Sequence, residues 1–456
     1  MQKSSGITPT EKHLARLCER AFLRLWSYPN LYRDQGGGKE LCDVLIVFGH
    51  DAIVFSDKSC AYPDTGEQVR DWARWFKRSI SASAQQVYGA ERWIRRHPDR
   101  IFLDTGCKHP LPLSLPPSDE LRVHRVVVAR GAGERCSTFF GGDSGSLMVR
   151  SDLVGTSHIN PPAGPFGLFR IGQLDPDRGY VHVLDDENLD ILLSELDTIA
   201  DFVAYLSRKE ALLCSEKVVL ATGEEDLLAY YLTHTNAKDE HDFVVPPDVN
   251  IVQFDHLYRE MRDDERYIAK KSADEVSYLI DQLIDHVSGN VIDRTLIDGN
   301  ELPFHDQENA LRVLASEDRL SRRHLARTLV DLWTTTSARG PARSRCVVTN
   351  EKSGTGYCFL VSPIPEDRDY CEYRHSRSVL LAACSKVMKL KFPALQHVVG
   401  YATEPLDGEQ RSQDLAYLDA TSWTETDAQE ARRLQARTEL LDSPTITHFR
   451  DQEYPT

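Results

Sequence analysis

The sequence has no long hydrophobic run and no closely spaced cysteines. No window approaches the run of about 18 apolar residues that a membrane span needs, and the first residues, MQKSSG, lack the apolar segment of a secretory signal. The ten cysteines contain no C-x-x-C pair, which excludes the spacing of a zinc ribbon or a dithiol redox motif. We therefore expect a cytoplasmic protein with no membrane partner, whose cysteines are reduced residues of the core.

Charge is distributed unevenly along the chain. Residues 1–150 carry 22 Lys and Arg against 17 Asp and Glu, a net charge of +5, whereas residues 151–456 carry 32 against 53, a net charge of −21. The mildly basic first part can bind a polyanion, while the acidic remainder repels DNA and suits a protein partner or a regulatory role. The 456 residues are enough for two or three cores, so we expect domains with different partners.

Residues 1–214 show the pattern of an α/β domain. Apolar residues spaced by three and four predict a first helix, two apolar runs joined by Gly49-His50-Asp51 predict a strand hairpin, and a long helix follows with a break near Ser79–Ser83. The predicted elements, in the order helix, strand, strand, helix, strand, are residues 10–27, 39–59 (the hairpin), 66–97 and 121–130, followed by a strand at 180–184 and a closing helix at 189–206.

Residues 215–456 predict a second domain, acidic and of the α+β class, whose role would be to sense a signal or to dock a partner. Arg339-Gly340-Pro341 separates its helical part from its mixed part. The predicted helices are residues 272–288, 306–333, 377–390 and 427–441, and the predicted strands are 346–348, 357–361 and 397–402.

The hairpin KELCDVLIVFGHDAIVFSDKS, residues 39–59, carries charged residues on strands that otherwise belong in a core. It can bring Asp43, on its first strand, close to Lys58, near the end of its second. Because side chains alternate along a strand, Ser56 and Lys58 share one face and Asp57 lies on the other. Asp43 and Asp57 are the candidate ligands for Mg²⁺, and a lysine beside them can orient or deprotonate an attacking water. This is the chemistry of phosphodiester hydrolysis.

The arrangement resembles the PD-(D/E)XK, or restriction-endonuclease-like, nucleases, most closely their NERD and Mrr-like branches. In that family a helix carries Glu, a strand is entered by Asp, the next strand ends in (D/E)-x-K and a helix carries Gln. The resemblance covers about residues 10–130, and the matching positions are Glu19, Asp43, Lys58 and Gln86, with Gln85 as the alternative to Gln86. It implies an endonuclease that hydrolyses DNA with little sequence preference, with Mg²⁺ as cofactor and Mn²⁺ as an alternative ion. Nucleases of this kind fused to unfamiliar domains resemble bacterial genome-defence proteins.

The sequence departs from this family at Ser56, where the motif requires an acid. The following helix can supply the missing carboxylate from Glu67, Asp71 or Glu91, or Asp57 can turn inward through a β-bulge. Glu40, three residues before Asp43, is a further acid, but it is expected to face the other way unless the strand starts after it. Without a substitute acid the domain is a catalytically inactive scaffold, which is the alternative function, and Asp57 and Lys58 then simply end a strand in solvent.

A row of four cations follows the hairpin. Arg70, Arg74, Lys77 and Arg78 are spaced to lie along one side of the long helix, where they can contact DNA phosphates. An ordinary solvated face is nearly as good an interpretation. The aromatic residues between these cations are expected to face the core, because a helix packed on a sheet needs large apolar residues on its buried side; they are Trp72, Trp75 and Phe76.

Three shorter motifs have simpler interpretations. Gly142-Asp143-Ser144-Gly145 resembles the nucleophile segment of trypsin-like proteases, but the sequence supplies no histidine in the matching context, so we interpret it as a glycine turn between two strands. We expect Asp185-Asp186-Glu187 to cap a helix and His241-Asp242 to lie in a loop, and neither to bind a metal.

Overall fold

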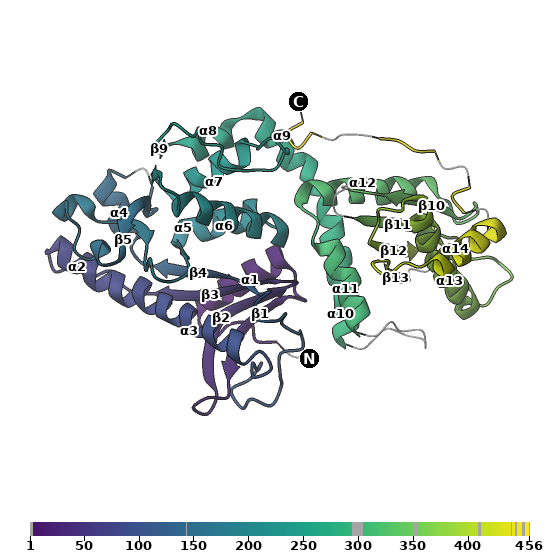
Figure 1. The fold of residues 1–456 in the computed structure, drawn as a ribbon, viewed down its shortest axis with the longest axis horizontal. Helices are drawn as coiled ribbons and strands as arrows, with labels where there is room; N and C mark the ends of the chain where they lie inside the picture. Colours follow the sequence, from purple (N-terminus) through teal and green to yellow (C-terminus); the bar gives the residue numbers. More distant parts are fainter. Residues whose placement is uncertain are drawn as a thin grey trace. The chain divides into compact units, whose positions relative to one another are not determined.

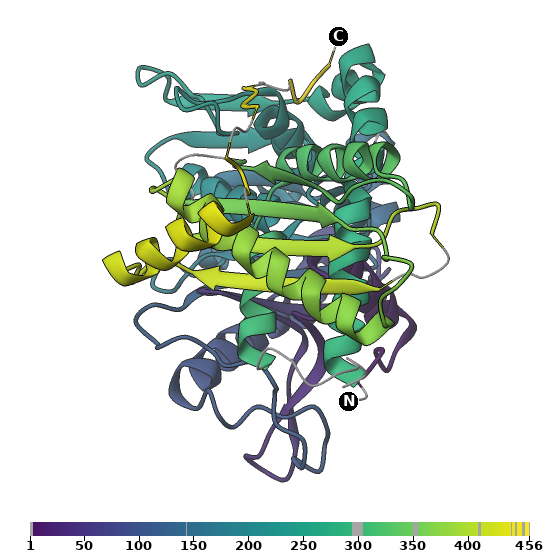
Figure 2. The same cartoon turned by 90° about the vertical axis from the view of Figure 1, so that its right-hand side faces the viewer.

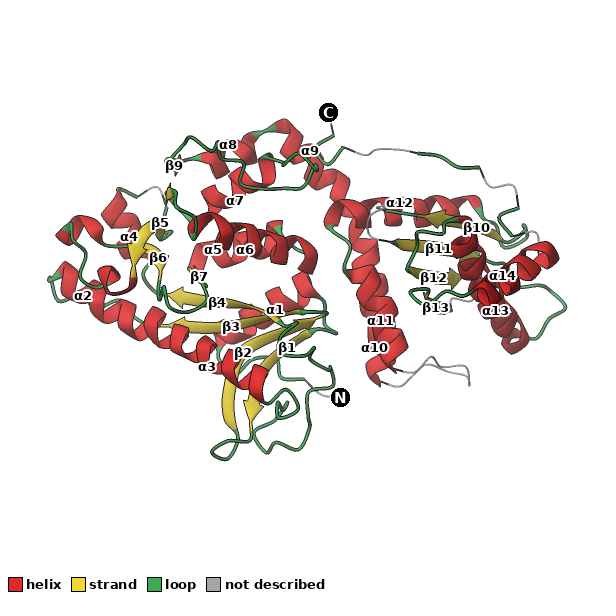
Figure 3. Cartoon of the chain, viewed as in Figure 1, coloured by secondary structure: helices red, strands yellow, loops and turns green. Residues whose placement is uncertain are grey.

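The computed structural model describes residues 3–142, 144–293, 304–349, 354–408, 412–438, 440–442, 445–448 and 452–455. The chain forms two compact units, Met1–Tyr267 and Ile268–Thr456 (Figure 1). Both contain helices and sheets, so the protein belongs to the mixed α/β class (Figure 3). Within the described residues, no helix combines the length and the apolar character that crossing a membrane requires.

A five-stranded mixed sheet forms the centre of the first unit. Its strands are arranged in the order β1-β2-β3-β4-β7. β1, β2 and β3 form an antiparallel meander, whereas β4 is parallel to β3 and β7 is parallel to β4. The bounds of the strands are β1 Ser27–Arg33, β2 Lys39–Phe48, β3 Asp51–Ser59, β4 Arg122–Arg130 and β7 Val181–Leu184.

Helices cover both faces of this sheet. On one face, Phe55 of β3 packs against Phe22 and Phe202, which belong to α1 (Pro9–Phe22) and α6 (Ile199–Leu213), and α5 (Asp186–Glu195) lies beside them. The next residue, Ser56, points to the opposite face and contacts Gln86 of α3 (Ala82–Arg96). The predicted long helix is continuous, because a π-helical segment, Lys77–Ser81, joins α2 (Gln68–Phe76) to α3 where a break was predicted.

β1 was not predicted from the sequence. The first helix was predicted to extend to residue 27, but it ends at Phe22, and the chain then enters β1. Tyr28-Pro29-Asn30 has the composition of a turn, but Tyr28 and Leu31 are buried in the core and the strand pairs with β2. Tertiary pairing therefore overrides local propensity at this point.

A second, smaller sheet completes the first unit. Its order is β6-β5-β8-β9. Because β8 pairs with β5 and β9 pairs with β8, residues 215–267 belong to this unit, and the structure divides the chain later than the expected boundary between residues 214 and 215. The remaining elements are α4 Gly133–Phe140, β5 Met148–Val154, β6 Arg170–Gln173, β8 Val218–Ala221, α7 Glu224–Thr233, β9 Ile251–Phe254 and α8 Leu257–Asp263.

The second unit is built on a four-stranded sheet of order β10-β11-β12-β13. Only the central strands β11 and β12 are parallel, and α13 connects them. α13 and α14 lie on one face of the sheet, and α11 and α12 pack on the other (Figure 2). The bounds are α9 Glu265–Asp274, α10 Tyr278–Asp293, α11 Phe304–Ala315, α12 Arg319–Thr335, β10 Arg343–Val347, β11 Thr355–Val361, α13 Tyr370–Lys391, β12 His397–Thr403, β13 Gln413–Asp419 and α14 Glu425–Thr438.

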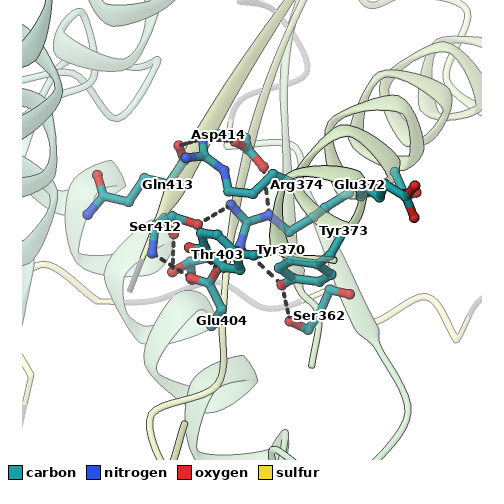
Figure 4. A network of polar contacts seen from close by, with 12 residues as sticks. Ser362, Tyr370, Glu372, Tyr373, Arg374, Thr403, Glu404, Ser412, Gln413 and Asp414 are labelled. Atoms are coloured by element: carbon teal, nitrogen blue, oxygen red, sulfur yellow. Dashed lines mark hydrogen bonds and ion pairs between the residues drawn. The ribbon is translucent and has the colours of Figure 1, made fainter. Parts of the chain in front are cut away.

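A buried ion-pair network joins α13 to β13 and to the segment that follows β12 (Figure 4). The Arg377 guanidinium, 0% exposed, lies 2.7 Å from Glu404 and 2.6 Å from Asp414, and it donates a hydrogen bond of 2.8 Å to Ser412. Arg374 pairs with the other oxygen of Asp414 at 2.6 Å. Two cations thus balance two carboxylates, so these charges are matched within the network.

We expect Arg377→Met to lower the free energy of unfolding of the second unit by about 3–5 kcal/mol, because Glu404 and Asp414 would stay buried without their main counter-charge. Lys386→Met on the same helix removes an exposed ion pair with Glu430 and should cost at most about 1 kcal/mol. Urea denaturation of the full-length variants measures both. Equal losses would show that the buried network contributes no more than a surface pair.

Candidate active site

The predicted hairpin opens at the end that carries the candidate residues. β2 and β3 pair only from Val44 and Phe55 to Phe48 and Asp51. Beyond that point β2 pairs with β1 alone, and the end of β3 pairs with β4. We call the place where β2 and β3 separate, between Asp43 and Asp57, the split. There the Asp43 carboxylate accepts a hydrogen bond of 2.6 Å from the backbone amide of Asp57.

Ser56 and Lys58 lie on the β3 side of the split. The Ser56 hydroxyl is buried and donates to the side-chain oxygen of Gln86 at 3.1 Å, so the predicted glutamine reaches the S-x-K segment. The Lys58 side chain is exposed, and within the described part of the chain its ammonium group forms no ion pair. Its backbone carbonyl accepts from Ser79 of the π-helical segment at 3.4 Å. Lys58 is therefore fixed at its backbone while its charge stays available.

The electrostatic environment of Asp43 disfavours its ionised form. Asp43 is 7% exposed. Burial, together with the nearby charges of Glu40 and Glu11, raises the pKa of Asp43 to about 7. Burial also raises the pKa of Glu40, which the charge of Lys58 partly offsets. Three carboxyl groups thus influence one another at the split, with a lysine as the nearby cation.

Asn30 brings two of these acids together. Its side-chain amide donates to Glu11 at 3.0 Å and to Glu40 at 3.3 Å. Glu40 was expected to face away from Asp43 on the assumption that the strand is regular, but β2 is irregular between these two residues. The pairing of β1 with β2 shifts register between Leu31 and Tyr32, and such a bulge re-aims the side chains that follow it.

Glu11 was not singled out from the sequence as a site residue, and Glu40 was considered but expected to face away. Glu11 also accepts hydrogen bonds from Ile7 and Thr8, as the acid of a capping box at the start of α1. In the sequence, Glu11 stands out only through the spacing Thr8-x-x-Glu11, and that spacing predicts a helix cap and not a site residue. Glu19, the expected α1 acid, lies two turns further along the helix and is not among the main groups that shift the Asp43 pKa.

The other proposed substitute acids have structural partners. Asp57 points to the opposite face, where its fully buried carboxylate pairs with Arg130 at 2.9 and 3.2 Å, so it does not turn inward toward Asp43. Glu91 pairs with Arg125 at 2.7 Å and with Arg95 at 3.0 Å. Asp71 accepts two hydrogen bonds from Thr65, and Glu67 pairs with Arg70 at 3.3 Å. None of these four carboxylates is directed to the split.

The four predicted cations Arg70, Arg74, Lys77 and Arg78 are exposed along α2 and the π-helical segment. The prediction for the aromatic residues between them is confirmed, because Trp72, Trp75 and Phe76 are buried. An open pocket of about 600 Å³ lies at the start of α2, and its lining includes Arg70, Asn160 and Pro165.

The protease-like segment has a different environment from a catalytic serine. It joins α4 to β5, not two strands as expected, and Asp143 lies outside the described residues. The Ser144 hydroxyl donates to Glu225 at 3.1 Å, an acid and not a histidine. Asp185 caps α5 as predicted, by accepting from the backbone amides of Glu187 and Asn188.

Comparison of the chain with protein families, curated proteins and solved structures finds no match. Within the described residues, no group of three or more His, Cys, Asp or Glu side chains is placed to hold a metal ion. The structure thus shows a mixed α/β protein in which a buried acid, Asp43, lies near the exposed Glu40.

The raised pKa of Asp43 predicts how stability depends on pH. A carboxyl group whose pKa rises from about 4 in the unfolded chain to about 7 in the folded state loses stability as pH rises through that interval. The full loss is about 4 kcal/mol. Asp43→Asn keeps an oxygen acceptor for the Asp57 amide, so this variant should be more stable than wild type at pH 8 and should lack this loss between pH 4 and 7. Urea denaturation at several pH values is the measurement.

Asp51→Asn is the matched control. Asp51 is also buried, but the hydrogen bonds from His124 and Arg122 outweigh burial and lower its pKa. This substitution should therefore destabilise the protein at pH 8. If both variants shift stability in the same direction, the environment inferred for Asp43 is incorrect.

Proposed function

We propose that the first unit is a restriction-endonuclease-like domain that hydrolyses DNA with the help of Mg²⁺. The observation that carries this proposal is Asp43, a buried carboxylate with a pKa of about 7 at the split, close to other acids and to an available lysine. A divalent cation would stabilise the ionised form of these acids, because it neutralises carboxylates that repel one another. The cytoplasmic location of the protein and its role in genome defence stay predictions.

The order of the elements supports the same class of protein. α1 is followed by β1, β2 and β3, then by the α2–α3 helix and β4, with β3 parallel to β4. β1 is the element of this order that was not predicted from the sequence. Asp43 lies on the strand that precedes the S-x-K segment, and Gln86 lies on the helix that follows it, as the resemblance requires.

The residues that would hold the ion are Asp43 and Glu40, with Glu11 close to Glu40 through Asn30. Two protein carboxylates fit Mg²⁺, which usually keeps several waters and takes further oxygens from substrate phosphate. When bound, the ion polarises the scissile phosphate and its bound water. Lys58 offsets the phosphate charge and orients the attacking water, and Gln86 positions β3 through Ser56, two residues before Lys58.

The alternative function is a catalytically inactive scaffold. Ser56 in place of an acid favours it, and so does the lack of a set of three metal ligands among the described residues. In that case the acidic remainder of the chain would dock a protein partner, as its net charge predicts. The two functions differ in whether a cation binds at Asp43.

Asp43→Asn and Lys58→Met should each reduce Mg²⁺-dependent nicking of plasmid DNA by at least about 100-fold, because the first removes a metal ligand and the second removes the charge that offsets the phosphate. Glu19→Gln, on α1 but away from the split, should keep full activity. Nicking by Asp43→Asn at the wild-type rate would exclude this site.

Metal binding can be measured without DNA. MgCl₂ or MnCl₂ at pH 8 should raise the melting temperature of wild type, since an ion that binds only the folded state stabilises it. The Asp43→Asn variant should show no such shift. If neither protein responds to the metal, the scaffold function is favoured.

The cation row predicts the salt dependence of DNA binding. Each phosphate contact contributes a slope of about −0.9 to the logarithm of affinity against the logarithm of salt concentration. Reversing Arg74 and Lys77 to Glu should weaken binding to every sequence tested and flatten the slope by about two. Reversal of Arg433 and Arg437, both exposed on α14, is the control. An identical slope for both double variants would show that the row is an ordinary solvated face.

A further inference from the structure

Three cysteines of the second unit lie together between β10, β11 and α13. Cys346 and Cys358 are directly opposite each other in the antiparallel pairing of β10 with β11. Their sulfur atoms are 3.7 Å apart. Cys358 also forms a hydrogen bond with the thiol of Cys384 on α13. These residues therefore form a continuous cluster of thiols, although they are far apart in the sequence and show no dithiol motif.

The surroundings of this cluster are apolar. Cys358 and Cys384 are buried, together with Met388, Leu395 and Val398. Cys346 is half-buried and is the thiol of the three that solvent reaches. We therefore expect a small oxidant dissolved in water to meet Cys346 first.

The pairing geometry suits a covalent bond between Cys346 and Cys358. Opposite residues of antiparallel strands have Cα atoms about 4.5–5.5 Å apart, and disulfides span Cα separations of about 4.4–6.8 Å. β10 is at the edge of the sheet, so it can shift toward β11 without breaking the pairing of another strand. Small side-chain rotations and such a shift bring the sulfur atoms to bonding distance.

We propose that Cys346 and Cys358 are a reversible redox pair, which a hydroperoxide oxidises to a cross-strand disulfide. In the first step the Cys346 thiolate attacks the peroxide, so that a sulfur–oxygen bond forms, the oxygen–oxygen bond breaks and one water (or alcohol) leaves after protonation. In the second step the Cys358 sulfur attacks the Cys346 sulfur, the sulfur–oxygen bond breaks, and the Cys358 proton leaves with the hydroxyl group as water while the disulfide forms. Two thiols thus give two electrons to one peroxide.

Cys384 provides an exchange partner. The hydrogen bond from Cys358 lowers the pKa of Cys384, which favours its thiolate. This thiolate can attack the Cys358 sulfur, form a disulfide between β11 and α13, and release Cys346 as a thiolate that takes up a proton. The oxidised unit therefore has two disulfide isomers, both centred on Cys358.

The experiment maps disulfides in the full-length chain. Cys214 and Cys371 are exposed, so both are first replaced by serine to prevent intermolecular bonds. The protein is treated with hydrogen peroxide, its free thiols are alkylated, and its peptides are identified by mass spectrometry. We expect a Cys346–Cys358 linkage, a smaller amount of Cys358–Cys384, and complete reversal by dithiothreitol.

Two variants separate this chemistry from random oxidation. Cys384→Ser should remove the second isomer and keep the first. Cys346→Ser should slow formation of every linkage to Cys358 at least tenfold, because the accessible thiol is lost. The proposal is overturned if Cys346 of the starting protein becomes singly oxidised without any linkage to Cys358, a result that does not depend on whether the Cys346 and Cys384 variants fold.

Discussion

The hydrogen bond from the Asp57 backbone amide to Asp43 replaces the ladder bond that β3 loses where β2 turns away. A buried amide needs an acceptor, and at this point β4 pairs with only the other edge of β3. Asp43 meets that need, and the result is a carboxylate fixed in a buried position. The raised pKa of Asp43 and the proximity of Glu40 and Lys58 both follow from this one constraint on the backbone.

Arginine partners separate the structural acids from the candidate catalytic acids. Asp57 and Glu91 lie against guanidinium groups, whose positive charges balance those of the carboxylates. Asp43 and Glu40 have no such partner among the groups that shift their pKa values most, and Asn30, a neutral side chain, holds Glu40 close to Glu11. Asp43 is thus a buried acid without an arginine partner, and such a group costs stability. Asp43 and Glu40 are the carboxylates proposed to hold the ion, and Ser56 leaves that site one ligand poorer than the family pattern.

The second unit neutralises its buried charge internally. Arg377 and Arg374 balance Glu404 and Asp414, and the thiol cluster lies on the same sheet, on the side of β11 that faces β10 and α13. The acidic composition of the chain therefore says little about this interior. The proposed redox pair would give the unit a chemical property that does not depend on this net charge.

The sequence by itself determined the mixed α/β class, the hairpin with Asp43 and Lys58, the buried aromatic residues of α2 and the helix cap at Asp185, because these depend on local periodicity and on neighbouring residues. It did not determine β1, the extent of the first unit or the partners of Asp57 and Glu91. It also did not reveal that Glu11, Glu40 and Asn30 meet. Strand pairing, a bulge and arginines from distant elements fix those features. Such long-range contacts leave no periodic signal, so only the tertiary structure decided which carboxylates belong to the site.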